Sequence, residues 1–82
     1  HRLHIGPIVG MEDVCAILAR NIKAARSLLG WSQEELAARA EIDRTYISGV
    51  ERQVRNPTIT VVAKLAKAIG TTTADLLTDR SN

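Results

Sequence analysis

Apolar residues recur every three or four positions along most of this chain, which is the period of one face of an α-helix. Between residues 13 and 29 the pattern predicts a long amphipathic helix. Gly30 follows its last apolar position and suits the backbone turn that ends a helix. The positions expected to face inward are Val14, Leu18, Ile22, Ala25 and Leu29, with Ile17 and Leu28 beside them.

Residues 33 to 52 predict two short helices joined by a tight turn, because their apolar positions form two short faces of helical period. Ser32 and Glu35 have the spacing of a capping box at the start of the first helix. Asp43 can cap the second helix with its side-chain oxygen. The residues expected to lock the two helices together are Leu36, Ala37, Ala40, Ile42, Ile47 and Val50.

Two more helices are expected after the loop at residues 53 to 57. Thr58 can cap a fourth helix that ends at Gly70, and Thr72 can cap a short fifth helix. The expected inward residues are Ile59, Val62, Ala66 and Ile69 in the fourth helix, and Leu76 and Leu77 in the fifth. The sequence has no strand pattern and no internal repeat, so it predicts one all-α domain of five helices.

The second short helix carries its polar side chains on one side. Stepping about 100° per residue from Ile47, at the centre of the buried face, separates an outward group from two flanking residues near the N-terminus. The outward residues are Thr45, Ser48, Gly49 and Arg52, and the flanking residues are Arg44 and Tyr46. This is the end of a helix that DNA-binding proteins present to base edges.

At these positions the chain resembles the phage-repressor-like helix-turn-helix transcription factors of the Cro and lambda-repressor type. It is most similar to the small controllers of restriction-modification genes. The residues that carry the resemblance are Ser32-Gln33-Glu34-Glu35-Leu36-Ala37, Arg44-Thr45-Tyr46-Ile47-Ser48, Glu51-Arg52 and Arg55-Asn56-Pro57. The resemblance implies a compact, five-helix lambda-repressor-like DNA-binding domain. Glu41 and Gln53 depart from the family, which usually has glycine at both positions.

The resemblance implies that residues 44 to 52 form a recognition helix in the major groove of double-stranded DNA. Arg44 can donate two parallel hydrogen bonds to guanine, and Thr45 offers a hydroxyl and a methyl group to a base edge. The residues expected to read bases are Arg44, Thr45, Tyr46 and Ser48. Those expected to contact phosphates are Gln33, Arg52, Arg55 and Asn56.

One charged pair is expected inside the domain. Arg26 lies one turn after Ile22, on the edge of the buried face of the first helix, and Glu51 lies on the inward side of the recognition helix. In the family that the chain resembles, an arginine and a glutamate at these positions form a partly buried ion pair. We therefore expect Arg26 and Glu51 to link the first helix to the recognition helix.

A homodimer is the expected working unit, because one short recognition helix reaches only a few base pairs. Two copies related by a two-fold axis place their helices about 34 Å apart on a palindromic or pseudopalindromic operator. A short terminal helix can bury only one of two adjacent leucines in its own domain. The residues expected at the dimer interface are Ile69, Leu76 and Leu77.

Composition changes this interpretation little. The net charge of +2 leans only weakly basic. Cys15 is the only cysteine, so a disulfide within the chain and a cysteine-ligated zinc are excluded, which fits a reducing cytoplasm. We expect no metal, cofactor or small-molecule ligand, and neither export nor a membrane span. A cytoplasmic, nucleoid-associated protein is the expected location.

Residues 1 to 10, which include His1 and His4, are expected to be a flexible extension or tag remnant before a domain at residues 11 to 82. An antitoxin or a protein-interaction module with the same fold is the alternative function. A protein of that kind is expected either to carry an added toxin-binding tail or to lack the outward arginine and hydroxyl groups, and the sequence shows neither feature. An enzyme is not expected, because the carboxylates are scattered along helix surfaces. Both repression and activation are compatible with the resemblance.

Overall fold

Five α-helices and their connecting turns make up residues 14–80, the part of the chain that the computed structural model describes. They are α1 (Val14–Leu29), α2 (Gln33–Ala40), α3 (Arg44–Glu51), α4 (Ile59–Ile69) and α5 (Thr73–Leu76). No strand occurs in these residues, so the predicted all-α class is confirmed. The expected extension at residues 1 to 10 lies outside the described residues.

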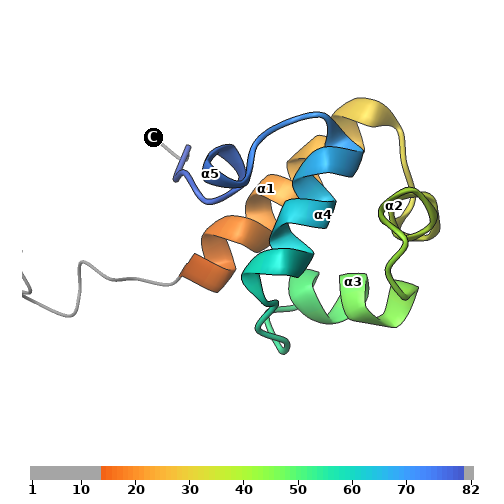
Figure 1. The fold of residues 1–82 in the computed structure, drawn as a ribbon, viewed down its shortest axis with the longest axis horizontal. Coiled ribbons are helices and arrows are strands. Elements are labelled where there is room, and N and C mark those ends of the chain that lie inside the picture. Colours follow the sequence, from red (N-terminus) through yellow and green to blue (C-terminus); the bar gives the residue numbers. More distant parts are fainter. Residues whose placement is uncertain (1–13, 81–82) are drawn as a thin grey trace, which may run out of the picture.

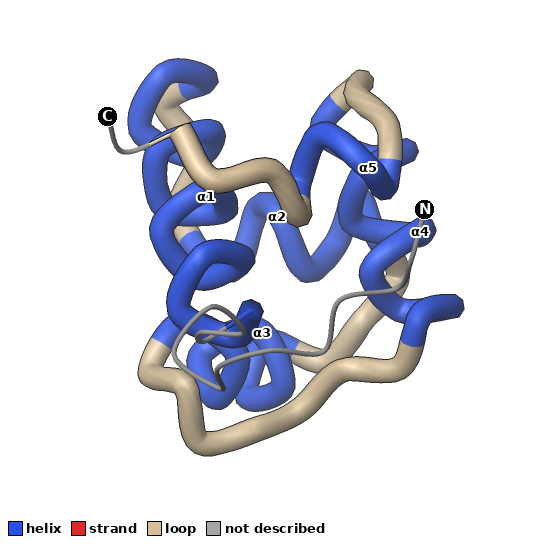
Figure 2. Tube along the Cα trace, turned by 90° about the vertical axis from the view of Figure 1, so that its left-hand side faces the viewer, coloured by secondary structure: helices blue, strands red, loops and turns tan. Residues whose placement is uncertain are grey.

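The helices pack so that α3 is held at one end of the molecule and α5 lies toward the other (Figure 1). α3 packs against both α1 and α2, α2 also packs against α4, and α5 bridges α4 and α1. Figure 2 shows α3 and the loop after it together at one edge of the domain. None of the helices between residues 14 and 80 is long and apolar enough to cross a membrane.

The core is built from aliphatic side chains of all five helices. Full burial of one leucine or isoleucine side chain contributes about 1.5 to 3 kcal/mol, so a small cluster of this kind can hold the domain together. The cluster consists of Leu18, Ile22, Leu36, Ala37, Ala40, Ile47, Val50, Val62, Leu65, Ala66 and Leu76. The interlocking residues predicted in α2 and α3 are among them.

Three residues predicted to face inward are exposed in the structure. Val14, Leu29 and Ile59 are 52%, 43% and 67% exposed, respectively. Each is the first or last residue of its helix, where no neighbouring element covers the inward direction. Leu65, which the prediction left out, is fully buried in α4. Helical period gives the direction of a side chain but not the presence of a partner in that direction.

Local hydrogen bonds define the helix ends as predicted. Each capping side-chain oxygen accepts a backbone N–H two or three residues further along the chain, which satisfies one of the free donors of the first turn. The N-caps are Ser32, Asp43, Thr58 and Thr72. Gly30 and Gly70 end α1 and α4 with φ of 73° and 92°, the left-handed backbone expected of them.

Glu41 and Gln53 also adopt left-handed backbone, with φ of 59° and 63°. These are the two positions where the resembled family usually has glycine. The turns close normally, because Ile42 N–H donates to the Ala37 carbonyl at 2.9 Å and Val54 N–H donates to the Gly49 carbonyl at 2.9 Å. The two turns therefore keep their geometry, although Glu41 and Gln53 have to adopt a left-handed backbone that is costly for residues other than glycine.

Replacing either residue by glycine should stabilise the domain. A left-handed non-glycine residue costs about 1 to 2 kcal/mol, and glycine gives back about 0.5 to 1 kcal/mol through its freedom in the unfolded chain. We expect Glu41→Gly and Gln53→Gly each to raise the free energy of unfolding by about 0.5 to 1 kcal/mol in urea titrations. Ala63→Gly, on an exposed face of α4, is the control and should lower it by about 1 kcal/mol. An equal loss of unfolding free energy in all three variants would mean that Glu41 and Gln53 are not strained.

Candidate nucleic-acid interface

A buried ion pair joins α1 to α3. Arg26 Nε donates to Glu51 Oε2 at 2.7 Å, and Arg26 Nη2 donates to Glu51 Oε1 at 2.9 Å. The Glu51 side chain is only 3% exposed, and that of Arg26 is 20% exposed. The remaining arginine nitrogen, Nη1, donates to the Trp31 carbonyl at 2.9 Å. The structure thus brings together the two residues expected to pair, in a bidentate geometry that suits a carboxylate.

Gln33 completes this cluster from the start of α2. Its Nε2 donates to Glu51 Oε1 at 3.0 Å, so the carboxylate accepts hydrogen bonds from two other helices. Burial raises the pKa of the Glu51 carboxyl, but the hydrogen bonds from Arg26 and Gln33 and the charge of Arg26 outweigh it, so the net pKa is lowered. The hydrogen bond to Glu51 raises the pKa of Arg26. Both groups therefore stay charged at neutral pH.

Arg44, the first residue of α3, is exposed and lies next to the start of α2. Its Nη1 is 3.5 Å from Gln33 Oε1, and its Nε is 3.6 Å from the Glu34 carboxylate. Because Glu51 takes the NH₂ group of the Gln33 amide, the amide oxygen is left to face Arg44. The expected base-reading arginine is thereby oriented through a chain of polar contacts that begins in the core.

Thr45 is exposed beside Arg44, and its hydroxyl already has one partner. The hydroxyl donates to Asp43 Oδ1 at 2.8 Å, and the Thr45 backbone N–H donates to the same oxygen at 2.9 Å. The backbone hydrogen bond is the main cause of the lowered pKa of the Asp43 carboxyl. Thr45 therefore offers hydroxyl lone pairs and a methyl group, which suit a base amino group and a thymine methyl.

Ser48 and Arg52 lie one turn apart on the outward side of α3. Arg52 Nε donates to Ser48 Oγ at 3.3 Å, so the two side chains form one exposed polar unit. Tyr46, on the flank, is half-buried and packs against the edge of the core. Ser48, expected to read bases, and Arg52, expected to contact phosphate, thus share the exposed side of α3.

Arg55 reaches α3 from the following loop. Its guanidinium carbon lies 4.8 Å from the centroid of the Tyr46 ring, within the range of a cation–π contact. Gly49, predicted to face outward, is instead buried, and an added Cβ there would meet Arg55 Cβ at 3.2 Å. Gly49 is buried because the side chain of Arg55 lies over a position that helical period alone places at the surface.

Asn56 faces a different part of the domain from the other expected phosphate contacts. Its Oδ1 accepts a hydrogen bond from the Cys15 thiol at 2.8 Å, which connects the loop to the start of α1. Asn56 also lines an apolar groove together with Val14 and Leu77. Among the expected phosphate contacts, only Gln33, Arg52 and Arg55 are therefore grouped around α3.

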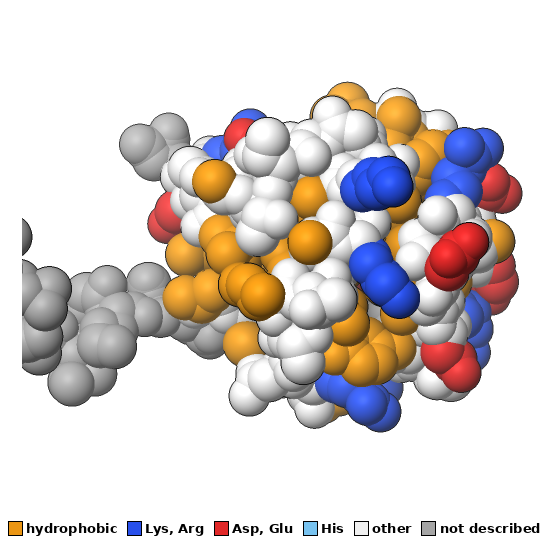
Figure 3. Space-filling model, viewed as in Figure 1, with side chains coloured by type: hydrophobic (Ala, Val, Ile, Leu, Met, Phe, Trp, Pro, Cys, Tyr) orange, Lys and Arg blue, Asp and Glu red, His pale blue; other side chains and the backbone are white. Residues whose placement is uncertain are grey.

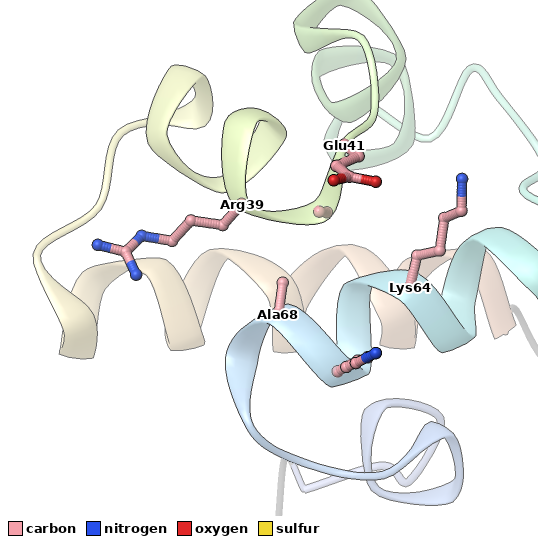
Figure 4. A pocket seen from close by; sticks show the side chains of 6 residues that line it. Arg39, Glu41, Lys64 and Ala68 are labelled. Atoms are coloured by element: carbon pink, nitrogen blue, oxygen red, sulfur yellow. The ribbon is translucent and has the colours of Figure 1, made fainter.

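A second groove lies between α2 and α4 (Figure 4). It has a volume of about 380 Å³ and includes none of the residues expected to contact DNA. Figure 4 shows Arg39 extending from α2 and Lys64 from α4, near Glu41 at the end of α2. Its lining residues are Arg39, Ala40, Glu41, Lys64, Lys67 and Ala68. Three of these residues, Arg39, Lys64 and Lys67, are positively charged, and none of the six belongs to α3.

The three residues expected at a dimer interface do not form one surface. Leu76 is 3% exposed and belongs to the core, because α5 turns it onto the rest of its own domain. Ile69 lines a groove with Leu28 and Leu76, whereas Leu77 lines another groove with Val14 and Ile59. Leu76 is therefore too buried to belong to a dimer interface, contrary to the prediction. Leu77 lies in the more apolar of the two grooves.

Comparison with known proteins identifies relatives over most of this chain. Residues 22–76 match the sequence profile of the family described as Helix-turn-helix. A hypothetical transcription factor of Neisseria meningitidis serogroup B is 44% identical over 66 residues, which cover 80% of this chain and 62% of that protein. The control protein C.SmaI of Serratia marcescens is also 44% identical over 66 residues, covering 80% of this chain and 79% of its own.

A solved structure of a related protein contains DNA. The restriction-modification controller protein C.Esp1396I is 34% identical, with a TM-score of 0.71 over 78% of this chain and 88% of its own. In that structure the controller is a tetramer in complex with its natural 35 base-pair operator. The fold described here is thus shared with a protein that binds an operator.

The buried pair should show strong coupling in a double-mutant cycle. We expect Arg26→Met and Glu51→Gln each to lower the free energy of unfolding by about 3 to 5 kcal/mol, because each leaves a buried partner without its counterpart. The double variant should lose less than the sum of the two single losses. Urea titrations of the four proteins measure this coupling.

The exposed pair Glu35–Arg39, at 2.6 Å, is the matched control. Its coupling in the same kind of cycle should be about 0.3 to 0.5 kcal/mol, as for other pairs of this spacing on helix surfaces. Strict additivity of the Arg26 and Glu51 losses would mean that the two residues do not act together.

Proposed function

Since the chain belongs to the helix-turn-helix family, we propose that it is a sequence-specific DNA-binding transcriptional regulator rather than an enzyme. The observation that carries this proposal is the single exposed surface at α3 that groups Arg44, Thr45 and Ser48 with Arg52. Its similarity to the control protein C.SmaI and to the operator-bound controller C.Esp1396I supports the same function. A regulator of this kind acts in the bacterial cytoplasm, on the DNA of the nucleoid.

α3 enters the major groove with its N-terminal end toward the bases. The Arg44 guanidinium leaves its weak contacts with Gln33 and Glu34 and donates two parallel hydrogen bonds to guanine. Thr45 contacts the neighbouring base pair through its lone pairs and methyl group. Arg44 and Thr45 thus supply the sequence preference, since base edges carry the sequence information.

Phosphate contacts orient the domain on the duplex. Arg52 and Arg55 flank the outward side of α3 and supply positive charge. The NH₂ group of the Gln33 amide is held by Glu51, so the contribution of α2 comes from the backbone N–H groups of its first turn. These contacts add affinity for any DNA sequence and make binding depend on salt.

The regulator works as a homodimer, because the eight residues of α3 reach only part of an operator. Val14 and Ile59, at 52% and 67% exposed, lie with half-buried Leu77 around a mainly apolar groove. Figure 3 shows hydrophobic side chains gathered on this side of the domain, near the start of α1. A second copy covers this groove, and binding in successive major grooves requires the two copies of α3 to lie about 34 Å apart. Regulation then follows the concentration of the protein itself.

Selection of binding sites from random DNA tests the function directly. The wild type should enrich a two-fold symmetric sequence, and Arg44→Ala should lose about 1 to 3 kcal/mol of binding free energy on it and relax the preference at one base pair. Arg55→Ala should weaken binding to all sequences alike and lower the salt slope by about one. Arg20→Ala, an arginine of α1 paired with Asp79, is the control and should select the wild-type site. An Arg44→Ala protein with unchanged preference would remove Arg44 from base reading.

Ile59→Asp tests the dimer without risk to the core. Ile59 is exposed and begins α4, where an acidic residue favours the helix, so the variant should fold normally. Sedimentation equilibrium should find it monomeric at concentrations where the wild type is a dimer, and its operator binding should lose cooperativity. Leu28→Asp is the matched control, because Leu28 is 88% exposed on a different groove. A dimer that survives Ile59→Asp and dissociates with Leu28→Asp would place the interface elsewhere.

A further inference from the structure

The loop after α3 is held so that it turns back along the helix. Gln53 N–H donates to the Val50 carbonyl at 3.1 Å, and Val54 N–H donates to the Gly49 carbonyl at 2.9 Å. With Gln53 in left-handed backbone, these two bonds make the closing motif that ends many helices. The chain after this motif therefore brings Arg55 next to the turn of α3 that contains Gly49.

Two residues of α3 receive the side chain of Arg55. Gly49 lies under its aliphatic part, since an added Cβ would be 3.2 Å from Arg55 Cβ and 3.6 Å from both Cγ and Nε. Tyr46 lies three residues earlier on the same side of the helix, with its ring centroid 4.8 Å from the guanidinium carbon. We refer to Gly49 and Tyr46 together as the arginine seat.

The backbone does not explain a glycine at position 49. Glycine is a poor helix former, and the positive φ that justifies Gly30 and Gly70 is absent at Gly49. A methyl group at 3.2 Å from Arg55 Cβ is closer than side chains normally pack. Arg55 Cβ is attached to a loop held by the bonds to α3, so an alanine at position 49 requires the loop or the arginine to shift by a few tenths of an ångström. The close approach of Arg55 is the physical reason for this glycine.

The stacked arginine is arranged well for an anion. A cation–π contact uses the face of the guanidinium, so the N–H groups in its plane stay free for hydrogen bonds. Tyr46 belongs to the first turn of α3, so its contact with the guanidinium places the charge of Arg55 near the N-terminal end of the helix. Arg55 is thus held beside the base-reading end of the helix instead of extending freely from the loop.

We propose that Gly49 and Tyr46 are positioning residues that hold Arg55 in its DNA-binding arrangement before DNA arrives. The proposal rests on the proposed DNA-binding function and deepens it by assigning a role to two residues of the recognition helix. A side chain ordered in advance loses less conformational freedom on binding, so the arginine seat increases affinity through Arg55. Tyr46 then acts chiefly through Arg55, and Gly49 acts without touching DNA.

Binding of the selected operator, measured by fluorescence anisotropy over a series of salt concentrations, tests the role of Gly49. Gly49→Ala should weaken binding about three- to tenfold, by the ordering cost of one long side chain. Its urea midpoint should stay close to that of the wild type, because the helix preference of alanine over glycine, about 1 kcal/mol, opposes the cost of the shift at Arg55. In an Arg55→Ala background the same change should have no further effect on affinity. An equal loss in both backgrounds, or no loss in the wild-type background, would overturn the proposal.

The ring of Tyr46 is tested in the same assay. Tyr46→Phe keeps the stacking surface and should bind as the wild type does, whereas Tyr46→Leu should weaken binding about two- to fivefold, the strength of an exposed cation–π contact. In the Arg55→Ala background the two variants should bind alike. If Tyr46→Phe loses as much as Tyr46→Leu, the hydroxyl contacts DNA directly and the seat is wrong. A wild type that selects no DNA sequence contradicts the proposed function itself, which separates the two failures.

Discussion

A buried carboxylate determines how three of the five helices meet. Glu51 of α3 is almost inaccessible to solvent, and its charge is balanced by Arg26 of α1 and by the amide of Gln33 at the start of α2. A lone buried charge costs several kcal/mol, so an arrangement that separates these groups is strongly disfavoured. Aliphatic contacts alone tolerate small shifts between helices, but a bidentate pair does not. The cluster therefore sets the position and rotation of α3.

The arrangement of the exposed surface of α3 depends on this cluster. The same Gln33 that donates to Glu51 faces Arg44 with its oxygen, so the orientation of an exposed arginine depends on a carboxylate in the core. On the other side of α3, the left-handed residue Gln53 turns the loop back and brings Arg55 onto Tyr46. Ordering of Arg55 before binding reduces the conformational freedom that this side chain has to lose in a complex.

Local features of this domain could be predicted from the sequence because they depend on residues at most a few positions apart. The capping residues, the glycines that end α1 and α4, and the existence of all five helices follow from side chains and backbone within one or two turns. The family resemblance identified the positions of Glu41 and Gln53 as ones that usually carry glycine, and both residues have positive φ. The pairing of Arg26 with Glu51 was also within reach, since helical period and family resemblance agreed.

Packing between elements decided the features that the period of a single helix cannot show. The periodic pattern treats Ile59 and Val62 alike, but only the latter is covered, because no element packs over the first residue of α4. α5 turns Leu76 into the core and leaves its neighbour Leu77 half-exposed. Gly49 lies outward by helical period and is buried by a side chain from the next loop. The sequence by itself thus determined the helices, their ends and their faces, whereas burial depends on contacts between elements, which only the assembled fold establishes.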